Sequence, residues 1–488
     1  MKIRNIFPAS GLNLAENLTI SGISDDSRKI LKNELFFIIP RKNFDIFSVL
    51  PKIEPKVAVF VAESSASSKL KKIIKTKPVV YVKNIQKEFV RAVDLFYEFK
   101  NNDLKVIGVT GTNGKTTTST LIYYLLNKLG AKTSLVSTVD YHIGQKIYPA
   151  DNTTPGFLAL RKLLKEAKDS GSRFLVTEVS SHAIEQERIK GIDFYRCLFT
   201  NLGRDHLDYH KTLKNYFKAK EKLFWDNRKS PSVINVDDPY GMRLLRRLNQ
   251  ALAYGTKEIS DFKITNISLN PFGSSFDLEY NKRLYTLKTR LCGRHNVFNT
   301  AAAFALIVSL GFEPQEVAEQ VESFNSVEGR LERVGDNIFV DYAHTPDALE
   351  TVLLALRDMG YHQIICVFGC GGDRDKGKRK MMGQIAGQLA DSNIVTSDNP
   401  RSEEPKEICS QIEKGFKTKN YKVIIDRKKA IEEAVRLLIE NKVISGAKQE
   451  KNCLLVAGKG HEDYQIIGPR RVAFKDSEVI RKILRTAN

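Results

Sequence analysis

The chain of 488 residues has a hydrophobic fraction of 42%, which is ordinary for a water-soluble protein, and a length that accommodates about three domains. No apolar run reaches the ~18 residues of a membrane-spanning helix, and the first residues lack the apolar core and cleavage site of a signal peptide. We therefore expect a cytoplasmic protein with no membrane span.

The chain is strongly basic, with a formal net charge of +20. Its lysines are spread along the whole sequence and do not form the basic arm or aromatic-interleaved patch that nucleic-acid binding favours. A basic surface also concentrates small polyanionic substrates. We expect small-molecule partners, no nucleic acid, and a monomer. The six cysteines have no zinc-binding spacing and are expected to be reduced core thiols.

The first segment, residues 1 to about 102, contains short apolar stretches at 34–39, 57–61 and 78–82 that alternate with lysine-rich stretches. This pattern predicts a small α/β module with a helix over 89–100. The polar break Asn101, Asn102 and Asp103 follows that helix. We place the first domain boundary there.

The most informative stretch is an apolar strand over 104–110, a glycine loop, and a helix over 116–129. Backbone N–H groups at such a loop favour phosphate, Lys115 neutralises the outer phosphates, and the Thr116 hydroxyl ligates Mg²⁺. The loop is a variant, because Val109 stands where the common pattern has its first glycine. The stretch predicts a nucleoside triphosphate site, against the alternative of a plain glycine turn. Its residues are Gly111, Thr112, Asn113, Gly114, Lys115, Thr116 and Thr117.

The segment 103–327 continues with strands at 173–179 and 196–200 that alternate with helices, which predicts a parallel sheet with right-handed crossovers. Glu178 ends one of these strands, where a carboxylate beside a phosphate loop is suited to hold Mg²⁺. The run 201–210, which contains His206 and His210, is too rich in ionisable groups for a plain connector. Taken alone, Glu178 also fits a solvated strand end, and each histidine a structural role.

From about residue 328 the pattern restarts, with strands at 338–342, 363–368, 393–397, 422–425 and 453–457. It predicts a second, doubly wound sheet. The first helix of this segment is signalled by Thr345 as N-cap, Pro346 at the first helical position and Gly360 after its end.

Polar runs at 341–346, 369–379, 398–401 and 458–462 follow four of these strands, at the edge where parallel sheets bind ligands. Arg374 and Arg401 offer planar forks for carboxylates, while Asn399 and Glu462 suit an ammonium or amide group. Together they predict a zwitterionic ligand. By itself the run 398–401 also fits a simple Asn-Pro turn.

These motifs, taken in order along nearly the whole chain, resemble those of the Mur ligases, and among them the members that use diaminopimelate. The matching runs are 110–117, 152–155, 178–182, 205–210, 293–299, 329–330, 341–346, 369–379, 398–401 and 458–462. The resemblance implies a three-domain α/β enzyme of peptidoglycan precursor synthesis. Residues 1–102 would hold the uridine diphosphate, 103–327 ATP, and 328–488 the incoming amino acid.

The resemblance also implies the reaction. ATP phosphorylates the terminal carboxylate of UDP-N-acetylmuramoyl-L-alanyl-D-glutamate, and the amine of meso-2,6-diaminopimelate attacks the acyl phosphate. A tetrahedral intermediate then expels phosphate. The chemistry is reasonable, because a carboxylate is a poor electrophile until its oxygen becomes a phosphate leaving group.

By resemblance, site residues carry over position by position. Catalysis and metal binding fall to Lys115, Thr116, Glu178, His206 and Lys220, with Lys220 carbamylated by CO₂ so that it holds a second Mg²⁺. The nucleotide is contacted by the loop and by Asn296, Asn299, Arg330 and Asp341. The muramoyl-dipeptide contacts are Ser27, Thr153, Thr154, Ser180, Gln186 and Arg188. Diaminopimelate is bound by Arg374, Asp398, Asn399, Pro400, Arg401, Gly458 and Glu462.

Without the resemblance, Lys220 would be interpreted as a solvated lysine on a helix. Arg401 carries the choice of amino acid, because relatives that use L-lysine lack the Asp-Asn-Pro-Arg form and an arginine pairs with the extra carboxylate of diaminopimelate.

The first domain departs most from the family pattern. Residues 25–28 match the uridine-side motif, but the run 40–45 replaces the usual glycine-containing stretch. Contacts to the uracil and pyrophosphate therefore stay open, with Arg41 and Lys42 as candidates to offset lost backbone contacts.

Three alternatives remain. The first is another ligase of the same superfamily, adding L-lysine or extending folate with glutamate. The second is a basic P-loop ATPase that acts on nucleic acid, whose ATP hydrolysis polynucleotide would stimulate. The third is a non-catalytic nucleotide-binding scaffold.

Overall fold

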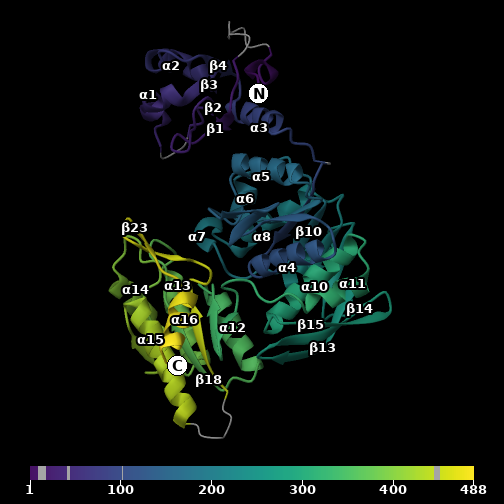
Figure 1. The fold of residues 1–488 in the computed structure, drawn as a ribbon, viewed down its shortest axis with the longest axis vertical. Helices are drawn as coiled ribbons and strands as arrows, with labels where there is room; N and C mark the ends of the chain where they lie inside the picture. The colour runs from purple at the N-terminus through teal and green to yellow at the C-terminus, as the bar shows by residue number, and fades with distance from the viewer. Residues whose placement is uncertain (9–17, 41–43, 102, 445–450, 488) are drawn as a thin grey trace. The chain divides into compact units, whose positions relative to one another are not determined.

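The computed structural model describes residues 1–488 except 9–17, 41–43, 102, 445–450 and 488 (Figure 1). The chain divides into two compact units. The first comprises Met1–Lys105, Pro155–Arg173 and Gln186–Ile192, and the second comprises Val106–Thr154, Phe174–Glu185 and Asp193–Asn488. The domain boundaries at 102 and 327 stay predictions, and residue 102 itself lies outside the described residues. No helix in the described part of the chain has the length and apolarity that a bilayer crossing requires.

The first unit is built on a four-stranded parallel sheet in the order β1-β2-β3-β4. Side chains of β2 alternate between two cores: Leu35 and Phe37 pack in the same cluster as residues of α3, and Phe36 packs with residues of α1 and α2. The predicted strands are confirmed, but the predicted helix begins earlier because Asn84 caps it by accepting from Lys87 N at 2.9 Å. The elements are β1 (Gly22–Ser24), β2 (Glu34–Phe37), α1 (Leu50–Ile53), β3 (Val57–Glu63), α2 (Ser67–Ile73), β4 (Val79–Val82), α3 (Ile85–Phe96) and α5 (Phe157–Asp169).

Arg161 on α5 ties the separate chain segments of this unit together. Its side chain is fully buried, Nε donates to Asp94 Oδ1 at 2.7 Å, and Nη2 donates to Lys190 O at 2.6 Å. Its guanidinium lies 3.9 Å from the ring centroid of Phe99. One side chain thus joins α5 to α3 and to the segment Gln186–Ile192.

Glu54 closes the turn between α2 and β4. Its Oε1 accepts hydrogen bonds from the backbone N–H groups of Lys75, Thr76 and Lys77 and from the Thr76 hydroxyl, at 2.6 to 3.2 Å. Burial acts to raise the pKa of Glu54, but these donors outweigh it, so the pKa lies below its usual value.

We expect Glu54→Ala to destabilise the protein by about 1–3 kcal/mol, because buried donors lose their acceptor. A group with a depressed native pKa stabilises above its unfolded pKa and loses that effect as the pH falls through the native pKa. The difference from wild type should therefore shrink below about pH 4. Denaturant unfolding at pH 7 and pH 3.5 measures the loss of stability and its dependence on pH. Glu98→Ala, at an exposed position, is the control. Equal stability of wild type and Glu54→Ala at pH 7 would contradict the prediction.

The second unit contains an eleven-stranded sheet in the order β15-β14-β13-β12-β11-β10-β5-β9-β6-β7-β8. Its interior pairs, from β13 to β10 and β10 to β5, and between β9 and β6, are parallel as predicted. The strands are β5 (Lys105–Thr110), β6 (Thr133–Val136), β7 (Asp140–Ile143), β8 (Lys146–Pro149), β9 (Phe174–Glu178), β10 (Arg196–Phe199), β11 (Ser232–Asn235), β12 (Ala251–Gly255), β13 (Phe262–Asn270), β14 (Gly273–Tyr280) and β15 (Arg283–Thr289). The helices are α4 (Lys115–Lys128), α6 (Ser181–Glu185), α7 (Leu207–His210), α8 (Leu213–Asp226), α9 (Pro239–Leu245), α10 (Arg294–Ser309) and α11 (Pro314–Val321).

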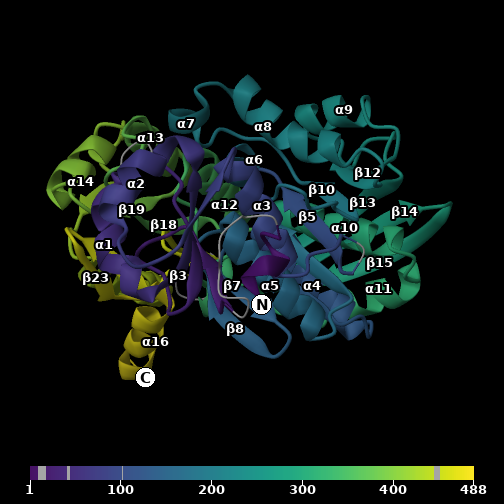
Figure 2. The same cartoon turned by 90° about the horizontal axis from the view of Figure 1, so that it is seen from above.

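Both edges of this sheet are antiparallel, which was not predicted. Figure 2 labels β7 and β8 of one edge and β13, β14 and β15 of the other. The physical reason is the length of the connections. Asn281 and Lys282 alone join β14 to β15, with φ of 48° and 62°. Two residues with positive φ form a tight hairpin turn, and such a turn joins only antiparallel strands.

The second unit also contains a six-stranded sheet in the order β16-β17-β21-β18-β19-β20, parallel except for β16. Side chains of β18 alternate: Ile364, Cys366 and Phe368 pack with α12, α13 and α14, whereas Ile365 and Val367 pack with α15 and α16. This is the predicted doubly wound arrangement. The elements are β16 (Glu332–Gly335), β17 (Ile338–Asp341), α12 (Pro346–Asp358), β18 (Gln363–Phe368), α13 (Gly377–Leu389), β19 (Ser392–Val395), α14 (Pro405–Glu413), β20 (Tyr421–Val423), α15 (Arg427–Ile444), β21 (Asn452–Ala457), β22 (Tyr464–Ile467), β23 (Arg470–Ala473) and α16 (Asp476–Ala487).

Candidate functional site

The loop between β5 and α4 runs so close to its neighbours that two of its positions admit only glycine. Gly111 has φ of 151°, and a Cβ there would lie 1.9 Å from Thr200 Oγ1. Gly114 has φ of 83°, and a Cβ there would lie 2.3 Å from Asn299 Oδ1. The predicted strand, loop and helix are therefore present, with the helix beginning at Lys115.

Thr116 and Glu178 meet behind this loop. Glu178, at the end of β9, is fully buried; its Oε2 accepts from Thr116 Oγ1 at 3.1 Å and from Thr138 Oγ1 at 3.1 Å, and its Oε1 accepts from Thr138 N at 2.7 Å. A carboxylate and a hydroxyl are hard oxygen donors of the kind that Mg²⁺ prefers. Thr138 was not predicted as a site residue, because it follows β6, a strand that was not predicted either.

Lys115 and Lys220 direct their ammonium groups at the same atom. Lys115 Nζ donates to Gly111 O at 2.9 Å and Thr112 O at 2.8 Å, and Lys220 Nζ, from α8, donates to Gly111 O at 2.7 Å. Burial lowers the pKa of Lys115. Burial, together with the charge of Lys115, holds the pKa of Lys220 well below its usual value. Lys220 is thus a buried lysine of the site, and the expectation of a solvated helix lysine is wrong.

His206 lies at the start of α7 with a positive φ of 53°. Its Nε2 is 3.4 Å from Asp205 Oδ2, and its ring centroid is 4.7 Å from that of His182. Burial lowers the pKa of His206 to about 4. Within the described ranges, no three His, Cys, Asp or Glu side chains form a metal cluster. A Mg²⁺ ion bound here would therefore need oxygens from its substrates as well, which is its usual mode of binding.

The four predicted nucleotide residues border the same space. Asn299 Nδ2 donates to Asn296 Oδ1 at 2.9 Å, and Arg330 Nη2 donates to Thr116 Oγ1 at 3.1 Å. Asp341, at the end of β17, accepts from Leu331 N at 2.6 Å, and burial raises its pKa to about 6. With the glycine loop, Glu178 and His206 they line a cavity of about 230 Å³.

A second cavity of about 490 Å³ is lined by six of the seven residues predicted to bind the amino acid. These are Arg374, Asp398, Asn399, Arg401, Gly458 and Glu462, while Pro400 is buried beside them. The two cavities share the lining residues Asp205, His206, Tyr342, His344 and Thr345. Tyr342 and His344 were not predicted as site residues, although both belong to the polar run 341–346 that follows a predicted strand.

Charges of both signs face this second cavity. Arg401 has φ of 55°, and its Nη1 donates to Gly372 O at 2.8 Å. Arg374 is exposed, with Nη1 donating to Asp373 O at 3.2 Å. The acidic lining residues are Asp205, Asp375, Asp398 and Glu462. A cavity with this mixture suits a zwitterion.

The predicted muramoyl-dipeptide residues fall in both units. Thr154 Oγ1 accepts from Ser180 N at 3.0 Å, and Thr153 Oγ1 accepts from Thr138 Oγ1 at 3.1 Å, so these three lie beside Glu178 in the second unit. In the first unit, Arg188 donates twice to Gln186 Oε1, at 3.0 and 2.7 Å, and Ser27 follows β1. The candidates Arg41 and Lys42 lie outside the described residues, as does Asn43.

Comparisons with known proteins agree with this geometry. Residues 109–307 match the family model of the Mur ligase middle domain, and residues 329–460 match that of the Mur ligase glutamate ligase domain. A curated relative from Clostridium acetobutylicum, UDP-N-acetylmuramoyl-L-alanyl-D-glutamate--2,6-diaminopimelate ligase 1, is 38% identical over 96% of this chain and 95% of its own.

Solved structures extend the likeness. One described as UDP-N-acetylmuramoyl-L-alanyl-D-glutamate--2,6-diaminopimelate ligase superposes with a TM-score of 0.65 at 29% identity, covering 100% of this chain and 99% of its own. The MurF ligase from Thermotoga maritima in complex with ADP has a TM-score of 0.63 at 19% identity, covering 96% and 98% of the two chains, and shares the fold.

Proposed function

Because this chain belongs to the Mur ligase family, we propose that it is the ATP-dependent ligase that joins meso-2,6-diaminopimelate to UDP-N-acetylmuramoyl-L-alanyl-D-glutamate. The product is a precursor of peptidoglycan, and ATP is converted to ADP and phosphate. The observation that carries the proposal is the shared wall of the two cavities. A phosphate loop on one side and a mixed-charge amino-acid site on the other meet at His206 and His344.

In this proposal the loop residues 111–117 hold the triphosphate, and Lys115 stabilises negative charge as the phosphoryl group moves to the substrate carboxylate. Lys115 Nζ is held by carbonyl oxygens of its own loop, so it is already close to the phosphate position. Asn296, Asn299, Arg330 and Asp341 contact the rest of the nucleotide. Ser27, Thr153, Thr154, Ser180, Gln186 and Arg188 contact the muramoyl dipeptide.

Two metal positions belong to the proposal. Thr116 and Glu178 fit Mg²⁺ through their oxygen atoms, and bound Mg²⁺ supplies positive charge to the phosphates. His206 and carbamylated Lys220 are the candidates for a second ion. The buried Lys220 supports this assignment, because an amine with a lowered pKa is more often uncharged and an uncharged amine is the form that reacts with CO₂.

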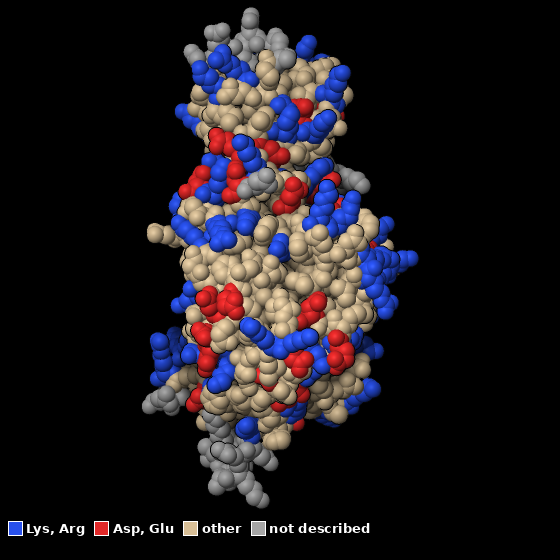
Figure 3. All heavy atoms as spheres, turned by 90° about the vertical axis from the view of Figure 1, so that its right-hand side faces the viewer, with Lys and Arg blue, Asp and Glu red and all other residues tan. Residues whose placement is uncertain are grey.

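The competing functions are less well supported. Figure 3 shows one face of the molecule, on which Lys and Arg are scattered with Asp and Glu among them, and no single basic stripe stands out there. This is the pattern expected of an enzyme with small anionic substrates rather than a motor on nucleic acid. A monomer in the cytoplasm, without nucleic acid as a partner, completes the proposal.

The product mass formed from the muramoyl dipeptide, ATP and either meso-diaminopimelate or L-lysine tests the proposal directly. We expect strong preference for diaminopimelate, and Arg401→Ala should raise its KM about 10²-fold because a carboxylate loses its paired cation. Turnover of L-lysine should not fall. Arg436→Ala, on the exposed surface of α15, is the matched control.

Arg401→Lys refines this test, since it keeps the charge but loses the planar fork and should recover only part of the affinity. Equal turnover of both amino acids by the wild-type protein would sink the assignment. Nucleic-acid-stimulated ATP hydrolysis without the dipeptide would favour the motor instead.

A further inference from the structure

Lys459 is a fully buried lysine next in sequence to Gly458, which lines the amino-acid site, and neither the motif assignments nor the proposed mechanism gives it a role. It follows β21 and is flanked by Gly458 with φ of 114° and Gly460 with φ of 52°. A Cβ at Gly458 would lie 2.6 Å from Asp398 Oδ2, and one at Gly460 would lie 2.7 Å from Tyr342 Cβ. The chain on both sides of Lys459 is therefore confined to one path.

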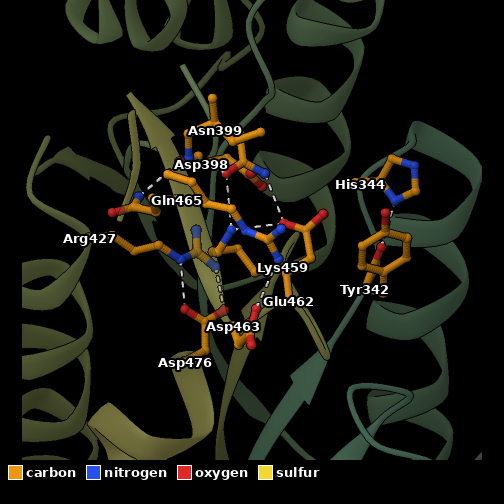
Figure 4. A network of polar contacts seen from close by, with 12 residues as sticks. Tyr342, His344, Asp398, Asn399, Arg427, Lys459, Glu462, Asp463, Gln465 and Asp476 are labelled. Carbon is orange, nitrogen blue, oxygen red and sulfur yellow. Dashed lines mark hydrogen bonds and ion pairs between the residues drawn. The ribbon is translucent and has the colours of Figure 1, made fainter. Parts of the chain in front are cut away.

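The ammonium group of Lys459 has two hydrogen-bond partners, Glu462 and Asn399, both of which line the cavity (Figure 4). It also lies 5.4 Å from the ring centroid of Tyr464. Nζ donates to Glu462 Oε2 at 2.9 Å and to Asn399 Oδ1 at 3.3 Å. Burying an unpaired ammonium group costs free energy, and the two hydrogen bonds to Glu462 and Asn399 offset that cost for Lys459. Lys459 and Glu462 form an ion pair whose lysine side chain is fully buried.

The two oxygens of Glu462 are used differently. Oε2 accepts from Lys459 Nζ and also from Asn399 Nδ2, at 2.8 Å. In the described part of the chain, Oε1 receives no hydrogen bond. The Glu462 side chain is 13% exposed and lines the second cavity, so Oε1 is the oxygen available to a ligand.

Asn399 keeps its orientation without help from Lys459. Its Oδ1 also accepts from Ile466 N at 2.9 Å, which fixes the amide with Nδ2 toward Glu462. Loss of Lys459 would thus act mainly on Glu462, which would be left with one neutral donor.

A buried ion pair holds the end of β21, the strand that precedes Lys459. Arg427 donates to Asp476 Oδ1 and Oδ2 at 2.8 and 2.7 Å, and its Nη2 donates to Ala457 O at 2.9 Å (Figure 4). Both side chains of the pair are fully buried. Gln465 Nε2 donates to Asp398 O at 2.8 Å. These hydrogen bonds hold the backbone just before Lys459, at Ala457, and just before Asn399, at Asp398. Loss of Lys459 should therefore move the Glu462 side chain rather than the backbone.

We infer that Lys459 is a positioning residue of the amino-acid site: it holds Glu462 by Oε2 so that Oε1 takes an ammonium group of the incoming amino acid. The inference rests on the proposed function for the identity of that amino acid. Lys459 itself is not placed to touch the substrate, because its side chain is fully buried and does not line the cavity.

A double-mutant cycle tests the inference, using Lys459→Met, Glu462→Gln and the double variant of the full-length protein. Lys459→Met should raise the KM for meso-diaminopimelate about 10- to 100-fold, the effect of losing a hydrogen bond to a charged group. The KM values for ATP and the muramoyl dipeptide should change less than about twofold. Loss of folded protein would lower the apparent kcat and leave all three KM values unchanged, so a selective rise in the diaminopimelate KM excludes it. Lys422→Met, exposed on β20, is the control and should match wild type.

The decisive comparison is between Glu462→Gln and the double variant. If Lys459 acts through Glu462, their KM values for diaminopimelate should agree within about threefold. This comparison also stands if Lys459→Met alone does not fold, because the double variant carries no unpaired Glu462 charge.

Two results would overturn the inference. One is a wild-type KM for diaminopimelate in Lys459→Met, and the other is a KM for diaminopimelate in the double variant that exceeds that of Glu462→Gln by more than about threefold. Failure of the wild-type protein to ligate diaminopimelate would be a different outcome, because it would remove the proposed function itself.

Discussion

Lys115→Met should lower kcat about 10³-fold, because the proposed role of its ammonium group is to stabilise charge on the phosphoryl group as it passes to the carboxylate. Lys115 Nζ donates hydrogen bonds to two carbonyl oxygens of the loop. Methionine has a similar unbranched side chain without the charge, so the variant removes the ammonium group and changes the packing little. Phosphate release that depends on both the muramoyl dipeptide and diaminopimelate measures the effect.

Lys128→Met is the matched control, since Lys128 lies exposed in the last turn of the same helix. It should keep wild-type kcat. A Lys115→Met protein that retains kcat within about tenfold would show that this lysine does not stabilise the transition state.

Lys220→Met should lower kcat about 10²- to 10³-fold, because the variant cannot form the proposed carbamate that would hold a second Mg²⁺. Lys220→Arg should be as poor, since guanidinium keeps the positive charge but does not react with CO₂. Wild-type protein from which CO₂ has been removed should lose activity and regain it when bicarbonate is added. The mass of the intact protein should decrease by one CO₂ when activity is lost and increase again when it returns.

Lys218→Met, exposed two residues away on α8, is the control for that helix and should behave as wild type. Activity that is indifferent to bicarbonate would contradict carbamylation, even if Lys220→Met is inactive. In that case the buried amine of Lys220 would act in its unmodified form on Gly111 O.

Local patterns in the sequence were enough to predict the elements that carry the site. The apolar run 363–368 is the strand β18 residue for residue. Thr345 caps α12 as predicted, accepting from Ala348 N at 3.3 Å. These features depend on neighbouring residues, and short-range chemistry determines them.

Contacts between distant residues could not be predicted in the same way. The Arg427–Asp476 pair joins residues 49 positions apart, and the Lys459–Asn399 contact spans 60 positions. Asn399 was predicted as a site residue, but Arg427, Lys459 and Asp476 look like ordinary surface charges in the sequence. Only the order of strands in the sheet brings the two members of each pair together. The flanking glycines of Lys459 were the one local signal, and they indicate a constrained backbone without naming the partner.

The first unit draws on three separate stretches of chain, and this limits how the protein can be cut or recombined. Phe157 and Leu158 of α5 pack against the cluster that contains Phe89, Ala92 and Val93. A fragment ending at residue 105 would leave that apolar surface in water and the Asp94 carboxylate without Arg161. Exchange of this unit between relatives would therefore have to transplant the two later stretches as well, so sequence divergence at 1–105 is expected to be matched by divergence at 155–173 and 186–192.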